Sequence, residues 1–268
     1  KNTHSSSKRL ESLDALRGFD LFFLVALGPL MHSLARTANV EWLNESMWVF
    51  SHVSWEGFSP WDLIMPLFLF MSGISMPFSL SRYKSISDKR PLLRRLAKRI
   101  LLLWIFGMMC QGNLLALDPN TIYLYSNTLQ AIATGYLITA LLFLFTSRRT
   151  QIITAVVLLL VYWTAMQFIT VDGYGGGNYT PQGNLAEWID NTVLGRFRDT
   201  AQVIDRKVVI ADWYHYTWIL SSLNFAVTTL TGLFAGYILK DKTRQSVRKF
   251  YLLAVIGVLL VAAGWLWS

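Results

Sequence analysis

Seven long apolar stretches constrain this chain more than any other feature of its sequence. Each is close to the roughly 20 residues that an α-helix needs to cross a hydrocarbon core about 30 Å thick. The sequence therefore predicts an all-α transmembrane helical bundle of about seven spans, in a single domain that covers residues 1–268. The predicted spans are Phe19–Ala35, Trp61–Ser81, Ile100–Leu117, Thr128–Phe145, Gln151–Thr170, Trp218–Leu239 and Phe250–Trp267.

The composition excludes an ordinary soluble protein. Hydrophobic residues make up 53% of the chain and charged residues only 15%, whereas a typical soluble domain has about 25% charged residues. A chain of 268 residues cannot bury so many apolar helices without lipid. The 11 tryptophans and 11 tyrosines, many of them near span ends, are typical of the aromatic belts at membrane interfaces.

The basic residues predict how the chain threads the membrane. Most of the 24 lysines and arginines precede the first span or lie between spans two and three, four and five, or six and seven. The positive-inside rule makes that side cytoplasmic. We therefore expect a multi-pass membrane protein with a cytoplasmic N-terminus and with the loop around His52 on the outer side. Topology and anionic lipid explain the net charge of +8, and no motif indicates a nucleic-acid partner.

His52 and Asp62 are the candidate catalytic residues. His52 opens the segment HVSWEGFSPWDLIMPLFLFMSGIS, and Asp62 lies ten residues later, at the start of the second span. An imidazole titrates near neutral pH, so His52 suits proton transfer as a general base. Asp62 would orient or support that imidazole, as the acid of a catalytic triad does. The alternatives are an ordinary interfacial histidine and a carboxylate that stabilises the N-terminus of a helix.

Five segments, taken in order, resemble the heparan-α-glucosaminide N-acetyltransferase family of membrane enzymes. The most specific is residues 52–75, which combine the histidine with an aromatic residue, Gly57, the Asp-Leu pair, a proline and a Phe-rich run. The other segments are LDALRGFDLFF (13–23), NTLQAIATGYL (127–137), GNLAEWIDNTVLG (183–195) and GLFAGYIL (232–239). Each short segment is weak alone, but their order and spacing make the resemblance specific.

This resemblance implies an enzyme that carries an acetyl group from cytosolic acetyl-CoA to an amino sugar or glycan on the far side of the membrane. Members of the family have about ten or eleven spans, so we expect this chain to lack three or four C-terminal spans, with a short homologue as the alternative. The resemblance to bacterial members also implies a bacterial inner membrane, with the His52 loop in the periplasm. The resemblance favours catalytic roles for His52 and Asp62, and Trp55 is a candidate substrate-binding residue. Asn127 and Gln130 enter span four from the outer side and are candidates for contact with the substrate, with interhelical hydrogen bonding as the alternative.

Two departures from the family pattern concern the acceptor more than the fold. Ala131 stands where the family has an arginine. Residues 214–218 read YHYTW, where the sugar N-acetyltransferase has an acidic stretch.

Charged residues near the inner ends of two spans are candidates for binding CoA. Arg17 and Asp20 lie at the start of the first span, and Arg94, Arg95 and Lys98 precede the third. A guanidinium matches the geometry of a phosphate. The alternatives are charges that set the topology, neutralisation of Arg17 by aspartates three residues away, and contact with anionic lipid.

Residues 171–217 form the longest predicted extramembrane segment. It begins with a Gly-rich loop, and we expect a short amphipathic helix over Leu185–Leu194. The tryptophans and tyrosines between residues 213 and 218 either mark the membrane interface or stack on a sugar. A single cysteine and four histidines without ligand spacing predict no metal site.

Two other functions remain open on the sequence alone. One is an O-acyltransferase of cell-wall or surface glycans. The other is a non-enzymatic transporter or lipid flippase, in which intramembrane polar residues would line a path. The expected partners are acetyl-CoA, a glycan acceptor and membrane lipid, with a homodimer left open. Binding of acetyl-CoA to the purified protein would separate the enzymes from the transporter.

Overall fold

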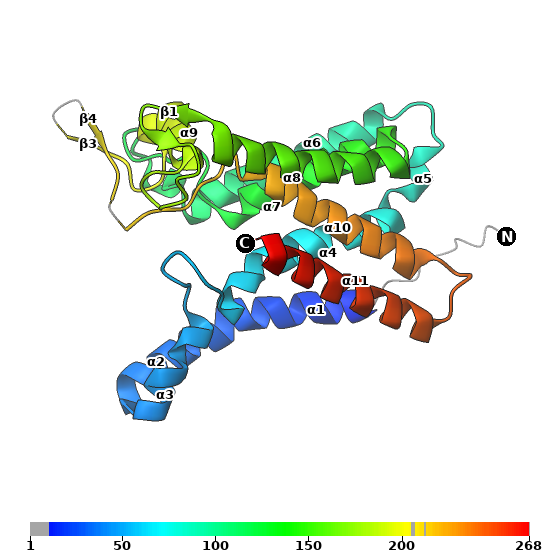
Figure 1. The fold of residues 1–268 in the computed structure, drawn as a ribbon, viewed down its shortest axis with the longest axis horizontal. Coiled ribbons are helices and arrows are strands. Elements are labelled where there is room, and N and C mark those ends of the chain that lie inside the picture. Colours follow the sequence, from blue (N-terminus) through cyan, green and yellow to red (C-terminus); the bar gives the residue numbers. More distant parts are fainter. Residues whose placement is uncertain (1–10, 205–206, 212, 268) are drawn as a thin grey trace.

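The protein is an elongated bundle of helices, with two small two-stranded sheets near one end (Figure 1). The computed structural model describes residues 11–204, 207–211 and 213–267. Within these residues, six helices are long and apolar enough to cross a membrane, which confirms the all-α polytopic fold. They are Glu11–Ala38, which comprises α1 (Glu11–Phe22), a π-helical turn and α2 (Gly28–Ala38); Pro60–Ser79, which continues into α4 (Ile64–Ser79); α7 (Thr128–Phe145); α8 (Arg148–Phe168); α10 (Ser222–Lys240); and α11 (Ser246–Trp267).

The third predicted span is the one that the structure changes. We predicted Ile100–Leu117, but the helix there, α6, covers Arg90–Cys110. It begins within the basic run, with Pro91 in its first turn, and it ends at Cys110. The next residues form a 3₁₀ turn, Leu114–Ala116, flanked by left-handed backbone that cannot continue a helix. Only the second half of α6 is therefore apolar, and the count of six spans does not include it.

Local sequence signals explain where the long helices begin. Asn127 caps α7 by accepting a hydrogen bond from the Leu129 N–H. The Gln130 side-chain oxygen accepts a hydrogen bond from the Asn127 N–H, and the two bonds form a capping box. Ser147 caps α8 through the Thr150 N–H. Such caps satisfy N–H groups that have no partner inside the helix.

Helices α4 and α10 form the centre of the bundle and make its most extensive helix contact. Glycines allow this approach. A Cβ atom on Gly232 would lie 2.0 Å from the Phe70 carbonyl oxygen, and one on Gly73 would lie 2.0 Å from the Thr229 carbonyl oxygen. Small residues at such crossings let backbones pack closely in membrane proteins, where lipid supplies little hydrophobic drive for association.

The outer helices expose their apolar side chains. No residue of α11 is buried, and most large apolar side chains of α8 are exposed. Helix α6 packs beside α7, with Leu92 and Leu96 in the main core cluster. Lipid is the solvent that such apolar surfaces require.

Two regions of short elements and loops lie at one end of the bundle, opposite the end that carries the Lys- and Arg-rich connections (Figure 1). The first region contains α3 (Glu41–Ser46) and a 3₁₀ turn, Met47–Phe50. The second contains the antiparallel pair β1 (Thr170–Val171) and β2 (Tyr174–Gly175), then α9 (Leu185–Leu194), then the antiparallel pair β3 (Gln202–Ile204) and β4 (Lys207–Val209). The short α5 (Ser81–Lys84) lies at the basic end. The predicted helix over Leu185–Leu194 is confirmed, although one face of it is buried against protein.

Replacing Gly232 with alanine should destabilise the protein. The new methyl group would overlap the Phe70 backbone, and overpacking of this kind typically costs about 1–3 kcal/mol. Thermal unfolding in detergent would report the loss as a lower midpoint. The control is Gly257→Ala in α11, where the new Cβ meets nothing within 4 Å and the midpoint should hold or rise slightly. Equal midpoints for both variants would contradict the close crossing.

Candidate functional site: a histidine–aspartate pair in an aromatic pocket

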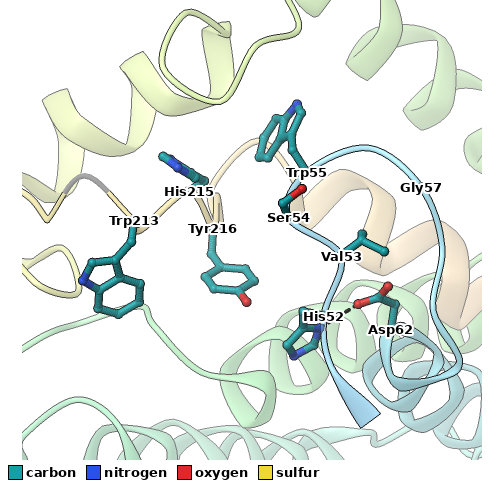
Figure 2. A pocket seen from close by; sticks show the side chains of 9 residues that line it. All are labelled: His52, Val53, Ser54, Trp55, Gly57, Asp62, Trp213, His215 and Tyr216. Carbon is teal, nitrogen blue, oxygen red and sulfur yellow. Dashed lines mark hydrogen bonds and ion pairs between the residues drawn. The ribbon is translucent and has the colours of Figure 1, made fainter. Parts of the chain in front are cut away.

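His52 and Asp62 are in direct contact. The His52 Nδ1 atom lies 2.6 Å from the Asp62 Oδ1 atom, as Figure 2 shows. The other carboxylate oxygen, Oδ2, accepts hydrogen bonds from the Ser59 N–H (2.9 Å) and the Ser59 hydroxyl (3.1 Å). Ser59 and Asp62 form the capping box of the 3₁₀ turn Pro60–Leu63, which leads into α4. Asp62 therefore has both of the roles that the sequence offered as alternatives: it caps the helix start and it holds the imidazole.

The pair faces a cavity of about 390 Å³. Its lining comes from two segments that are far apart in the sequence, the loop before α4 and the strand-to-helix connection before α10. The lining residues are His52, Val53, Ser54, Trp55, Gly57, Asp62, Trp213, His215 and Tyr216. About half of the His52 side chain (53%) is exposed, against 26% for Asp62, so the imidazole is open to a ligand while the carboxylate is partly covered.

Aromatic side chains form much of the pocket wall. Trp55 donates from Nε1 to the Tyr179 carbonyl oxygen at 2.9 Å and meets the His215 ring edge-on at 6.1 Å between centroids. The Tyr216 ring packs edge-on to His52 at 6.2 Å. Trp55, which the sequence predicts as a substrate residue, thus lies in the same pocket as the His52–Asp62 pair.

The sequence leaves two roles open for Trp213 and Tyr216, a membrane-interface marker or a stack on a sugar, and it does not assign His215 to the site. Tryptophan and tyrosine gather at the interface in most membrane proteins, which favours the first role on sequence alone. The available signal was a histidine among dense aromatic residues, on the same predicted side of the membrane as His52. To predict that these two segments form one pocket, one must know which loops meet in space, and hydrophobic periodicity does not give that information.

A buried polar network fixes the connection that carries Tyr216. The Arg198 side chain is fully buried, and its two terminal nitrogens lie 2.5 Å from the two carboxylate oxygens of Glu187 in α9. Arg198 also donates to the Tyr216 carbonyl oxygen at 3.2 Å. The Asp190 carboxylate accepts from the N–H groups of Trp218 (2.6 Å) and Ile219 (3.0 Å). The backbone on both sides of residue 217 is thereby tied to α9.

Burial raises the pKa of Asp190 to about 6, although the two backbone N–H groups and the Arg198 charge act in the opposite direction. Removing a charged carboxylate from water disfavours its ionised form, and this cost exceeds what the hydrogen bonds return.

Asn127 and Gln130 lie outside the lining of the pocket. Gln130 is fully buried, and its amide bonds the Ser126 and Asn127 N–H groups and the Leu124 carbonyl oxygen. Asn127 donates to Gln111, which in turn donates to Asp199. Both side chains therefore have structural partners, and their contact with a substrate stays a prediction.

Arg17 lies nearer to the pocket than we expected. Its guanidinium donates to the Met71 carbonyl oxygen at 3.5 Å and lies 3.7 Å from the Asp14 carboxylate. Met71 follows Asp62 by nine residues along one helical segment, a rise of roughly 14 Å, which is about half of a membrane core. Asp20 is buried, and its Oδ2 atom has no hydrogen-bond partner among the described residues.

The basic half of α6 is exposed along the C-terminal half of α7. Arg94, Arg95, Lys98 and Arg99 are all exposed. The Arg99 guanidinium stacks over the ring of Tyr136, in the middle of α7, at 4.2 Å. Arg95 donates to the Tyr83 hydroxyl at 3.0 Å. Charge at this depth is costly in lipid and is typically tied to function or to paired partners.

Within the residues that the structure describes, no cluster of three or more histidine, cysteine, aspartate or glutamate side chains could hold a metal ion.

The fold and pocket define a polytopic membrane protein with a histidine–aspartate pair in a cavity at one end of its bundle. Residues 9–175 match the family model described as the catalytic region of heparan-alpha-glucosaminide N-acetyltransferase. The chain therefore belongs to the heparan-α-glucosaminide N-acetyltransferase family, as its motifs predicted. The Mus musculus protein named heparan-alpha-glucosaminide N-acetyltransferase is 24% identical over 288 aligned positions, which cover 92% of this chain and 42% of the mouse protein. The chain thus spans less than half the length of that relative.

Acidification should stabilise the fold through Asp190. The folded state holds the pKa of this group at about 6, above the ordinary value of about 3.9 in an unfolded chain. The folded state therefore binds the proton more tightly, so the contribution of Asp190 to stability rises as the pH falls from about 7 to about 4. The difference between the two pKa values corresponds to roughly 3 kcal/mol.

Thermal midpoints in detergent at about pH 7.5 and about pH 5 would measure this contribution. Asp190→Asn is neutral at both pH values, so the gain on acidification should be smaller than in the wild type. The exposed Glu45→Gln provides a matched control that should follow the wild type. An identical gain in the Asp190→Asn variant would contradict the assignment.

Proposed function

We propose that this protein is an acetyltransferase that moves an acetyl group from cytosolic acetyl-CoA to an amino sugar or glycan on the outer face of a bacterial inner membrane. The observation that carries the proposal is the His52–Asp62 pair, 2.6 Å apart and open to a cavity, in a chain of an N-acetyltransferase family. The name of the mouse relative supports a glucosamine-type acceptor.

The geometry supports a role for His52 as general base. A carboxylate only accepts hydrogen bonds, so the Nδ1 atom that faces Asp62 carries the proton and donates it. The Nε2 atom then has a free lone pair, which can take a proton from an acceptor. Asp62 is itself held by two hydrogen bonds from Ser59, so it can fix the imidazole and stabilise its charged form.

The proposed reaction is a direct displacement on the thioester. The nitrogen or oxygen of the acceptor attacks the carbonyl carbon, and its proton passes to His52. The tetrahedral intermediate collapses as the carbon–sulfur bond breaks, and the sulfur leaves with the proton returned by His52. The products are the acetylated acceptor and CoA with a free thiol, which balances the reaction for an amine or a hydroxyl acceptor.

Arg17, Asp20, Arg94, Arg95 and Lys98 remain our proposed binding residues for CoA. Arg17 supports this best, because it lies roughly 14 Å along α4 from the catalytic pair and CoA is a long molecule with phosphates at the end opposite its thiol. Asp20 is the buried acidic neighbour of Arg17 in this site. Arg94 and Lys98 are exposed cations that a phosphate can reach.

Two variants of the purified protein should distinguish the rate of acetyl transfer from the affinity for acetyl-CoA. His52→Ala should lose about 10²- to 10⁴-fold in the rate of acetyl transfer and keep its affinity for acetyl-CoA. Arg17→Ala should weaken the binding of acetyl-CoA by roughly tenfold or more, because a charge-assisted hydrogen bond is worth about 1.5–3 kcal/mol. Calorimetric titration of acetyl-CoA and product formation with glucosamine would measure the two effects.

The control for the histidine is His32→Ala. His32 bonds the Gly28 carbonyl oxygen within its own helix and is outside the pocket lining, so transfer should stay near the wild-type rate. A His52→Ala protein with wild-type turnover would refute the proposed base.

Cysteine labelling in whole cells tests the proposed sidedness. Gln182→Cys, in the exposed loop before α9, and Ser87→Cys, before α6, would be made in a Cys110→Ala background, since Cys110 is exposed. An impermeant maleimide should label position 182 and leave position 87 unlabelled until the cells are opened. The reverse pattern would overturn the topology and the transmembrane route of the acetyl group.

A further inference from the structure

Acyl transfer needs a second group besides the base. As the acceptor attacks, the carbonyl oxygen of the thioester becomes an oxyanion, and fixed hydrogen-bond donors at that oxygen often supply the largest part of catalysis. The His52–Asp62 pair does not meet this need, because its imidazole handles the proton of the acceptor. The donor should therefore lie on the pocket wall that faces the pair.

Tyr216 meets the geometric requirement. Its ring packs edge-on to His52, and Figure 2 shows it projecting into the pocket between Trp213 and His52, with the hydroxyl towards the imidazole. Its side chain is half-exposed to the cavity. Among the described residues, the Tyr216 hydroxyl has no hydrogen-bond partner, whereas the indole N–H of Trp55 is already engaged by Tyr179. The phenol is therefore free to donate to a ligand.

The position of Tyr216 is fixed from behind. Its carbonyl oxygen accepts from Arg198, which is fully buried and held by both oxygens of Glu187. The Asp190 carboxylate accepts a hydrogen bond from the N–H of Trp218, which lies two residues after Tyr216. The ring of Tyr214 supports that of Tyr216 at 5.5 Å. Preorganised donors are the effective ones, because they need no rearrangement when charge develops.

We propose, on the basis of the proposed function, that the Tyr216 hydroxyl stabilises the oxyanion of the acyl group while His52 takes the proton of the acceptor. Tyr216 then donates a hydrogen bond and keeps its proton throughout the step. Burial and the negative charge of Asp62 both raise the pKa of Tyr216, so the phenol stays in its donating form well above neutral pH. The buried Arg198 acts through Tyr216 and is a positioning residue.

Tyr216→Phe tests this role, because it removes the hydroxyl and keeps the ring. Acetyl transfer would be followed by thiol release from acetyl-CoA, with glucosamine as the amine probe and N-acetylglucosamine as the hydroxyl probe. The expected result is a fall in kcat of about 10²- to 10³-fold, with the KM for the acceptor, the affinity for acetyl-CoA and the thermal midpoint close to wild type.

Tyr214→Phe is the matched control. It removes the neighbouring phenol hydroxyl, which accepts from the indole of Trp218 outside the pocket, so it should lower the thermal midpoint and leave kcat within a few-fold of wild type. Two failures are distinguishable. Wild-type rates in Tyr216→Phe, alongside an inactive His52→Ala, would overturn the role of Tyr216 alone. A wild-type protein that transfers acetyl to neither probe and does not bind acetyl-CoA would overturn the proposed function and this inference together.

Discussion

The carboxylate of Asp62 connects the start of α4 with the loop that carries His52. One of its oxygens caps the turn that leads into α4, and the other holds His52. Because α4 also makes the central crossing with α10 through Gly73 and Gly232, the imidazole is attached to the most tightly packed element of the bundle. This attachment fixes the orientation of a loop residue, as the proposed role of His52 as a base requires.

The opposite wall of the pocket depends on charge buried outside the membrane core. Arg198 and Glu187 would each be expensive to bury alone, and they are tolerated because the pair is bidentate and the terminal nitrogens of Arg198 also donate to Asn191 and to the Tyr216 carbonyl oxygen. Such a pair contributes little net stability, but its geometry is strict. It orders an irregular segment, residues 213–217, that has no helix or strand of its own.

Much of the fold was predictable from sequence, because its signals are local. Apolar length located the spans, and the amphipathic pattern located α9 at Leu185–Leu194. The pairing of His52 with Asp62 was also predictable, since the two residues are close in sequence and matched a family motif. Helix α6 was misplaced because its apolar run continues past Cys110, where left-handed residues at Asn113 and Leu117 end the helix. The contact of Tyr216 with His52 could not be predicted, because it joins distant loops, and hydrophobic periodicity does not encode such contacts.

The two walls of the pocket can form at different times during synthesis of the chain. His52 and Asp62 are ten residues apart, so their contact can form as soon as the start of α4 has been synthesised. Tyr216 follows about 150 residues later, which at about 5–20 residues per second means a delay of roughly 8–30 s. During that interval the His52–Asp62 pair has no facing wall. The Arg198–Glu187 pair precedes Tyr216 in the sequence, so it can already be in place when the Tyr216 backbone arrives to accept a hydrogen bond from Arg198.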